Sequence, residues 1–378
     1  MLAISREDKG KAIAETPNQI TRIFSNLYKV KSQSNGGEYT VTNDLVGWSC
    51  SCPDHIHRGV KCKHIWAVEI SFALRQRIVR RVIAPLDAQV CPICSSKRIV
   101  KHGVRHNKFG DLQRFTCRDC GKRFVMNLGF EGMKASPKII TSAMQLYFTG
   151  ESLRNVQRFL RLQGVGVSHV TIYRWIRKYV GLMEKYLEQI TPQLSDTWRA
   201  DELYVKIKGD MKYLFAVMDD ETRFWIAQEV ADTKQGFDAR QLLRNAKEVA
   251  GRQPRTLVTD GLASYHEAYL KEFYTVRKDT RTVHVREIKM SGEVHNNKME
   301  RLNGEVRDRE KVMRGLKKKE TPILVGYQIY HNYMRPHEAL KGKTPADACG
   351  IEVEGPNKWL TIIQNARRHS RVSVGGGT

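Results

Sequence analysis

Seven of the eight cysteines in this 378-residue chain fall into two clusters whose spacing suits the ligands of a metal ion. The candidate ligands are Cys50, Cys52, Cys62 and His64 in the first cluster, and Cys91, Cys94, Cys117 and Cys120 in the second. Three thiolates with one imidazole, or four thiolates, make the closed tetrahedral sets that structural zinc requires. The sequence therefore predicts two structural zinc ions, one in each cluster.

The first cluster lies between a predicted hairpin and a predicted helix. Residues 37–48 (GEYTVTNDLVGW) alternate as the strands of a hairpin do, and residues 64–74 (HIWAVEISFAL) are typical of the start of a helix. The order Cys-x-Cys, spacer, Cys-x-His resembles a SWIM-type zinc finger, which we place in residues 1–82. His55 and His57 in the spacer are competing ligands, and buried cysteines without a metal are the other interpretation. Either DNA or protein fits as the partner of this finger.

The second cluster consists of two Cys-x-x-Cys turns with 22 residues between them. Each turn directs two thiolates at one ion, and the arrangement resembles a zinc ribbon, which we place in residues 88–127. The spacer is slightly longer than usual. A hairpin would fill it, with strands at Arg98–Gly103 and Gln113–Cys117 around a polar turn at Asn107–Asp111. A redox Cys-x-x-Cys pair, the alternative, lacks its usual βαβ setting, and Cys349 is expected to be an ordinary buried residue.

The chain is strongly basic, with 64 Lys and Arg against 40 Asp and Glu and a net charge of +24. Between Arg75 and Phe124 there are 13 Lys and Arg against three Asp. Such an excess destabilises a compact fold unless a polyanion neutralises it, so we expect double-stranded DNA as the partner. The residues expected to contact phosphates around the second cluster are Lys97, Arg98, Lys101, Arg105, Lys108 and Arg114. The competing interpretation is a generic basic surface on which each of these charges is solvated.

Hydropathy argues against a membrane protein or a secreted one. No segment reaches the roughly 18 uncharged apolar residues that a membrane-spanning helix needs. Residues 1–15 (MLAISREDKGKAIAE) have no apolar core like that of a signal peptide. We therefore expect a cytoplasmic, nucleoid-associated protein that keeps its thiols reduced and contacts no membrane.

Residues 136–180 are predicted to form three short helices that begin at Ser136, Ser152 and Ser168, each a good N-cap. In the third helix the residues that repeat at helical spacing and should face inward are Ile172, Trp175, Ile176 and Tyr179. The candidate DNA contacts off this stripe are His169, Thr171, Arg174 and Lys178. The pattern is typical of a helix-turn-helix whose third helix enters the major groove, with a plain helical linker as the alternative. Residues 181–194 should be a helical connector closed by Pro192.

From Trp198 the pattern changes to that of an α/β domain, placed in residues 195–350. The expected strands are Asp201–Ile207, Tyr213–Met218, Arg223–Val230, Thr256–Thr259 and Thr282–Val285, with helices near 237–249, after Gly261 and from His295. Three consecutive antiparallel strands followed by alternating helices and strands predict an α/β RNase H-like core with a mixed five-stranded sheet. In that layout Asp201 in the first strand and Asp260 after the fourth lie close together, and a Glu on the last helix reaches both.

Four segments of this region resemble the prokaryotic insertion-sequence transposases of the DDE superfamily, whose core is similar to that of retroviral integrases. The segments are WRADELYV (198–205), LVTDGLASY (257–265), HNNKMERLNGEVRDREKVMRG (295–315) and YHNYMRPHEALKGKTPADA (330–348). The resemblance covers roughly residues 88–350, including the zinc ribbon and the helix-turn-helix. It implies that Asp201, Asp260 and Glu300 are the catalytic triad, and that Arg307 is the basic residue that follows the glutamate and contacts phosphate or DNA.

Two features depart from the family pattern. Asp260 and Glu300 are 40 positions apart, more than the familiar spacing, and the basic segment 274–289 between them is a candidate DNA contact. A SWIM-type finger at the front of such a protein is also unusual. The alternatives that the residues leave open are Glu305 in place of Glu300, and Asp219 or Asp220 in place of Asp201.

Three clustered carboxylates raise one another's pKa values, a cost that divalent cations remove. Two Mg²⁺ (or Mn²⁺) ions prefer such hard oxygen ligands and can assist an in-line displacement at phosphorus. The resemblance thus implies a DNA transposase that binds element ends, cleaves and transfers strands, and assembles as a homo-oligomer on DNA. The alternative is a catalytically inactive DNA-binding regulator derived from a transposase. Residues 351–378 are expected to be a C-terminal helix with a flexible tail from Ser373.

Overall fold

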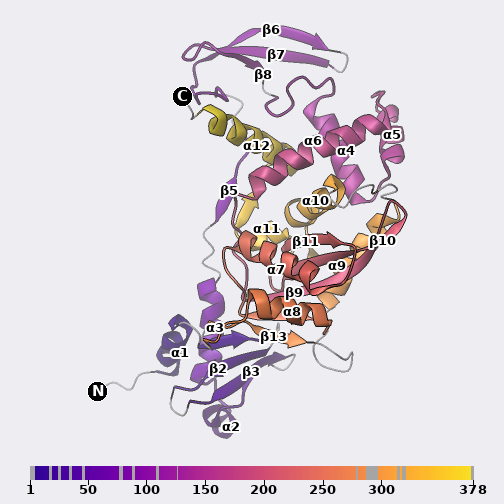
Figure 1. The fold of residues 1–378 in the computed structure, drawn as a ribbon. Helices are drawn as coiled ribbons and strands as arrows, with labels where there is room; N and C mark the ends of the chain where they lie inside the picture. The colour runs from indigo at the N-terminus through magenta and orange to yellow at the C-terminus, as the bar shows by residue number, and fades with distance from the viewer. Residues whose placement is uncertain are drawn as a thin grey trace. The chain divides into compact units, whose positions relative to one another are not determined.

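The computed structural model describes residues 5–16, 19–23, 27–33, 36–44, 47–75, 80–86, 90–107, 110–125, 127–277, 280–286, 297–312, 316 and 321–375 (Figure 1). The chain divides into two compact units. The first comprises Met1–Val79, Gln193–Tyr204 and Tyr213–Asn303, and the second comprises Arg80–Pro192, Val205–Lys212 and Gly304–Thr378. Within the described ranges, no helix combines the length and the hydropathy needed to cross a membrane.

The first cysteine cluster lies in a small N-terminal module of a sheet and three helices. Its strands form an antiparallel sheet in the order β1 (Ile20–Arg22), β2 (Leu27–Lys31), β3 (Glu38–Asp44) and β4 (Gly47–Cys50). Its helices are α1 (Arg6–Glu15), α2 (Pro53–Arg58) and α3 (Lys63–Arg75). α1 approaches α3 closely at Gly10, where a Cβ atom would lie 2.5 Å from Trp66 Cβ. The predicted hairpin and helix are both confirmed.

The second cluster lies on a three-stranded antiparallel sheet of β6 (Ile99–Asn107), β7 (Gly110–Cys117) and β8 (Arg123–Val125). The predicted hairpin is confirmed, but the expected turn at residues 107–111 is too long. Asn107 pairs with Gly110, because the backbone hydrogen bonds of the ladder continue through polar residues as readily as through apolar ones. The register shifts between Lys101 and Val104, beside Gly103, whose φ of 73° suits a bulge.

Three helices follow the ribbon: α4 (Pro137–Thr149), α5 (Leu153–Leu162) and α6 (His169–Leu187). The serine before each helix accepts a hydrogen bond from a backbone N–H of the first turn, as predicted for N-caps. The four residues of α6 that were expected to face inward are all buried. The predicted connector after residue 180 is helical in its first part, where it is not a new element but the end of α6. α6 continues to Leu187 because its buried stripe continues through Met183 and Leu187.

The central sheet has five strands in the order β11-β10-β9-β12-β13. They are β9 (Thr197–Ile207), β10 (Asp210–Asp219), β11 (Trp225–Ala231), β12 (Thr256–Thr259) and β13 (Val283–Arg286). β10 pairs antiparallel with β11, whereas β12 pairs in parallel with both β9 and β13. The helices that accompany the sheet are α7 (Gly236–Ala250), α8 (Ala263–Glu272) and α9 (Asn297–Glu310). This mixed order is that of an RNase H-like fold, so the predicted fold class is confirmed.

One boundary in the core differs from the sequence prediction. The third strand begins at Trp225 rather than Arg223, because the Asp219 carboxylate binds backbone N–H groups of the turn and Arg223 has a φ of 57°. The helix predicted near 237–249 is confirmed as α7; Phe237 in its first turn is 74% exposed, whereas later positions such as Leu242 are buried.

Shorter elements complete the second unit. They are β5 (Arg81–Ile83), α10 (Pro322–Ile329), a π-helix (Tyr330–Met334), a 3-10 helix (Glu338–Leu340), α11 (Pro345–Ala348), β14 (Ile351–Val353) and α12 (Lys358–Gly375). β14 pairs in parallel with β5, which joins segments far apart in the sequence, and Cys349 is buried as expected. The C-terminal helix is confirmed, but it runs into the predicted tail because no residue before Gly375 breaks a helix. Residues 376–378 lie outside the described residues.

Candidate active site and zinc centres

The parallel pairing of β9 and β12 places Asp201 and Asp260 side by side. Val258 lies opposite Arg199, so the residues two positions further on, Asp260 and Asp201, are at the same level of neighbouring strands. Asp260 directly follows the last residue of β12, where the chain leaves the sheet toward α8. The carboxyl ends of parallel strands are where open α/β sheets gather their ligand-binding side chains.

Three carboxylates converge at this point, from Asp201, Glu202 and Asp260. One oxygen from each lies within 4.8 Å of one oxygen from each of the others, a grouping that can hold a metal ion. Asn303 Nδ2 donates a hydrogen bond to Asp201 Oδ2 at 2.8 Å, and the Glu202 backbone N–H donates to Asp201 Oδ1 at 2.9 Å. Asp260 Oδ1 accepts from the Leu262 N–H at 3.1 Å. We call Asp201, Glu202 and Asp260 the carboxylate group.

Glu202 is the member of this group that the sequence analysis missed. Successive side chains of a strand point to opposite faces, so Asp201 alone was expected to face the site. β9 pairs with β12 only as far as Arg199, and beyond that residue both side chains can reach past the end of β12. The sequence contained one weak signal, a second carboxylate directly beside the first.

Glu300 lies in the first turn of α9 and is exposed. It is not one of the carboxylates within 4.8 Å, although its charge contributes to raising the pKa of Asp201 and it therefore lies nearby. Arg307, on the same helix, is also exposed, and the two side chains form no ion pair among the described residues. The structure thus brings together two of the three predicted carboxylates and leaves the third beside them, facing solvent.

Asp219 and Asp220, the alternatives to Asp201, are fully buried and bound elsewhere. Asp219 accepts hydrogen bonds from the turn that follows it. Asp220 is bound by Arg199 Nε at 2.5 Å and by Lys298 Nζ at 2.7 Å. Since Lys298 lies two residues before Glu300, this buried ion pair anchors the first turn of α9 to the end of β10 and so positions Glu300.

Glu305, the alternative on α9, is engaged in a structural ion pair. Arg335 Nη1 binds its Oε2 atom, and His331 Nδ1 lies 3.9 Å from the same oxygen. His331 and His337 are both buried, as packing residues are. The assignment of the catalytic glutamate to Glu300 stays a prediction that these contacts favour.

Burial raises the pKa of Asp201 to about 7. The negative charge of Glu202 adds to this shift, with smaller additions from Asp260 and Glu300, while the Glu202 N–H opposes it. An aspartic acid in this state carries a proton over much of the neutral range, and a cation would take the proton's place. Oxygen ligands of this kind fit a hard divalent cation.

We expect cation binding at the carboxylate group to depend on pH with a midpoint near pH 7. Below this value Asp201 must lose its proton before a cation binds, so the affinity for Mn²⁺ should fall about tenfold per pH unit. Above it the carboxylate is already ionised, and the affinity should level off. A Mn²⁺ titration followed by the electron paramagnetic resonance of the free ion measures the effect. An affinity that stays constant between roughly pH 5.5 and 8 would contradict it.

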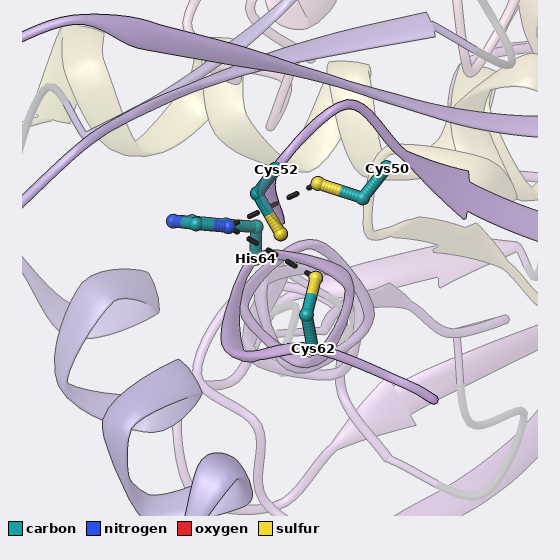
Figure 2. A group of neighbouring side chains, drawn as sticks. All are labelled: Cys50, Cys52, Cys62 and His64. Atoms are coloured by element: carbon teal, nitrogen blue, oxygen red, sulfur yellow. Dashed lines mark hydrogen bonds between the residues drawn. The ribbon is translucent and has the colours of Figure 1, made fainter. Parts of the chain in front are cut away.

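The first zinc centre is assembled from the end of β4 and the start of α3. Figure 2 shows the three sulfurs and the imidazole of Cys50, Cys52, Cys62 and His64 turned toward one point. Cys50 Sγ and Cys62 Sγ each lie 3.9 Å from His64 Nδ1. A tetrahedral zinc ion keeps its ligand atoms about 3.7 Å apart, and all four residues are buried, so the residues present fit zinc.

The spacer histidines do not join this centre. His55 Nδ1 is hydrogen-bonded to the Val60 carbonyl at 2.8 Å, and His57 is exposed. The hydrogen bond from Cys50 holds the pKa of Cys62 well below its usual range. The cluster therefore carries a thiolate, the form of cysteine that binds metals.

The second zinc centre is assembled from the two Cys-x-x-Cys turns. Cys91 Sγ lies 3.7 Å from Cys120 Sγ, and Cys94 Sγ lies 3.6 Å from Cys117 Sγ. These separations are too long for disulfides, which span about 2.05 Å, and they match the ligand edges of a zinc tetrahedron. The two turns have the same form, since each ends on a residue with positive φ, Ser95 or Gly121. All eight predicted zinc ligands thus converge in their two predicted groups.

The predicted DNA contacts are mostly exposed. Those of the ribbon that face solvent are Lys97, Arg98, Lys101, Arg105 and Arg114, while Lys108 lies outside the described residues. Arg98 also pairs with Asp119 at 2.7 Å. On α6, Arg174 and Lys178 are exposed, whereas His169 and Thr171 are half-buried. The Thr171 hydroxyl lies 3.0 Å from that of Ser168, which gives Thr171 a part in the helix cap.

Comparisons with known proteins agree with this architecture. The SWIM zinc finger family matches residues 39–72, and a DDE domain family of the IS240 type matches residues 195–337. The transposase of the insertion sequence-like element IS431mec of Staphylococcus aureus is 36% identical over 84 residues, 22% of this chain and 38% of that protein. The iso-IS1N protein InsA of Shigella dysenteriae is 33% identical over 72 residues, 19% of this chain and 74% of that protein. The chain therefore spans well under half the length of the staphylococcal transposase.

Solved structures of retroviral integrases were also found. The catalytic core domain of HTLV-2 integrase is 13% identical with a TM-score of 0.30, and the match covers 42% of this chain and 98% of that one. The simian T-cell lymphotropic virus intasome is 15% identical with a TM-score of 0.33, and the match covers 54% of this chain and 72% of that one.

The sheet has the strand order of an RNase H-like fold, and aspartates lie at the end of its parallel strand pair. A DDE domain family matches the same region. Together these features define the class of the DDE proteins of mobile elements. Within that class, the chain belongs with the proteins of prokaryotic insertion sequences, and its core is a DDE domain of the IS240 type. Membership implies a divalent metal in the core and zinc in the SWIM finger.

Proposed function

We propose that the chain is a DNA transposase that binds the ends of an insertion element and catalyses metal-dependent cleavage and transfer of DNA strands. The observation that carries the proposal is the convergence of Asp201 and Asp260 in one carboxylate group at the end of β9 and β12. Carboxylates this close repel one another, and binding a cation offsets that cost. The raised pKa of Asp201 is the expected sign of such a site.

The residues that would hold two Mg²⁺ (or Mn²⁺) ions are Asp201, Asp260 and Glu300. Such ions, when bound, assist the attacking oxygen and stabilise the leaving oxygen of a displacement at phosphorus. Asn303 keeps the Asp201 carboxylate oriented by its hydrogen bond, and Lys298 anchors the turn that carries Glu300. Arg307, exposed on the same helix, contacts a phosphate of the bound DNA.

One site serves both reactions because only the attacking oxygen differs. In cleavage, water attacks a phosphodiester, the bond from phosphorus to the 3′ oxygen breaks, and the element end is left with a 3′-hydroxyl. In transfer, that 3′-hydroxyl attacks a phosphodiester of the target, which joins the element to the target and releases a target 3′-hydroxyl. In each step the attacking oxygen forms a bond to phosphorus and a 3′ oxygen leaves as a hydroxyl.

The modules ahead of the core supply DNA binding in this proposal. The zinc ribbon (88–127) presents exposed Lys and Arg that neutralise phosphates, and the segment 136–180 presents Arg174 and Lys178 on α6. One zinc ion in each cysteine cluster holds the SWIM finger and the ribbon in shape. Because the two ends of an element are processed together, we expect a homo-oligomer on DNA.

The test is a joining assay with the full, zinc-loaded chain and a duplex that carries the inverted repeats flanking its coding region. We expect nicking at the element end and joining to a target plasmid when Mg²⁺ is present. Mg²⁺ is omitted, rather than chelated, in the control because chelators also remove zinc. Binding of the duplex without any joining at any Mg²⁺ concentration would instead identify a regulator that has lost catalysis.

A further inference from the structure

Glu202 belongs to the carboxylate group without being part of the expected triad. Its side chain is only 4% exposed, and Lys234 Nζ lies 2.6 Å from its Oε1 atom. Lys234 lies over two tyrosine rings, 5.2 Å from the centre of Tyr204 and 5.0 Å from that of Tyr213. The lysine is therefore held in place, and it in turn holds one oxygen of Glu202.

The other oxygen of Glu202 is left without a partner. Oε2 is buried and accepts no hydrogen bond of normal geometry from any described residue. A buried carboxylate oxygen in this state destabilises the folded chain unless something satisfies it. The carboxylate group brings three carboxyl groups together, and Lys234 pairs with only one of them.

A second buried polar atom faces the same place. The Tyr265 side chain is fully buried, and its hydroxyl makes no hydrogen bond of normal geometry within the described part of the chain. Burial raises the pKa of this hydroxyl, and the charges of Glu202, Asp201 and Asp260 together with a hydrogen-bonding contact to Glu202 raise it further, so it lies against the carboxylate group. Glu202 and Tyr265 are thus close together, yet neither Glu202 Oε2 nor the Tyr265 hydroxyl completes a hydrogen bond of normal geometry within the described residues, so a cation bound at Oε2 would satisfy that oxygen.

We propose that Glu202 is a fourth carboxylate ligand of the metal site: it offers Oε2 to the divalent cation held by Asp201 and Asp260, while Lys234 fixes its orientation through Oε1. This inference rests on the proposed function, since it concerns the same cation. It extends the expected set of Asp201, Asp260 and Glu300 by one residue that the structure places closer to both aspartates than Glu300. The alternative is that Glu202 only pairs with Lys234.

The test measures Mn²⁺ binding directly, by the electron paramagnetic resonance of the free ion, on the full zinc-loaded chain at about pH 8, where Asp201 is ionised. Glu202→Gln keeps the size of the side chain and the hydrogen bond to Lys234 but removes the charge. We expect at least a tenfold weaker affinity for Mn²⁺. Glu202→Asp, which restores the charge, should bind more tightly than Glu202→Gln.

The matched control is Glu272→Gln. Glu272 is also well buried, with 10% of its side chain exposed, and it is paired with Arg240 and Arg244 outside the carboxylate group. We expect this variant to bind Mn²⁺ like the parent. If Glu202→Gln also binds like the parent while Asp201→Asn loses binding, Glu202 is no ligand and the proposed metal site stands. If the parent and Asp201→Asn bind equally, the metal site and the role of Glu202 fall together.

A second variant keeps the test decisive if Glu202→Gln does not fold. Lys234→Met removes the cation that pairs with Glu202 and leaves its negative charge uncompensated. A Mn²⁺ ion bound at the carboxylate group would then compensate that charge. We expect Mn²⁺ to raise the melting temperature of Lys234→Met by more than it raises that of the parent. An equal or smaller rise would contradict the proposal, because a glutamate that only pairs with Lys234 gains nothing from the cation.

Discussion

Asp201→Asn and Asp260→Asn are each expected to abolish DNA cleavage and strand transfer, with rates at least about a thousandfold below the parent's. Each change keeps the size of the side chain and removes the charge that holds a cation. Losing about 4 kcal/mol of transition-state stabilisation corresponds to roughly this factor. DNA binding should be unchanged, because it belongs to other modules of the chain. Joining assays and gel shifts at one salt concentration measure the two properties side by side.

The same experiment decides between the two glutamates of α9. Glu300→Gln should lose catalysis like the aspartate variants. Glu305→Gln should keep it and lower the melting temperature, because Arg335 then lacks its charged partner. Asp210→Asn, exposed at the start of β10, is the control that should change neither. Loss of joining in Glu305→Gln together with full activity in Glu300→Gln would reverse the assignment.

Cys62→Ser and Cys117→Ser are each expected to remove one of two zinc ions and to unfold the module that held it. Structural zinc contributes on the order of 10–16 kcal/mol to the folding of a small site, more than such a module gains from its own core. The parent should contain two zinc ions per chain and each variant one. Metal analysis gives the count, and limited proteolysis locates the unfolded module.

Cys349→Ser provides the matched control for the zinc variants. Cys349 is buried like Cys62 and Cys117 but lies in neither cluster, and its thiol donates to the Ala346 carbonyl at 3.3 Å. This variant should keep two zinc ions and a protease-resistant finger and ribbon. A parent chain with intact modules and no zinc would show that the cysteine clusters are structural without a metal.

The local features of the fold could be predicted from the sequence because their signals are local. Cys-x-Cys and Cys-x-x-Cys spacings determine where thiols can meet around one ion, whatever the rest of the chain does. Ser136, Ser152 and Ser168 cap their helices through their own first turns. The alternation from Asp201 to Ile207 and the position of Asp260 after a short strand were sufficient to predict that the two aspartates meet.

The features that local pattern did not reveal depended on contacts with other elements. The connector after residue 180 is part of α6 because apolar residues beyond Gly181 continue its buried stripe. Phe237 satisfies the helical spacing of α7 and is nonetheless exposed. Spacing identifies which residues share a face, but it does not tell which part of that face another element covers.

By itself, the sequence determined the two cysteine clusters, the basic character of the chain and the RNase H-like order of its strands, because each of these depends on spacing or composition alone. Only the tertiary structure decided the membership of the carboxylate group. Glu202 enters the group because β12 ends where β9 continues. Asp220 and Glu305 are excluded because Arg or Lys side chains already bind them. Asp219 is excluded because it accepts hydrogen bonds from the turn that follows it. Which charges meet depends on where neighbouring strands stop and which cations pack beside them, and both are properties of the folded chain.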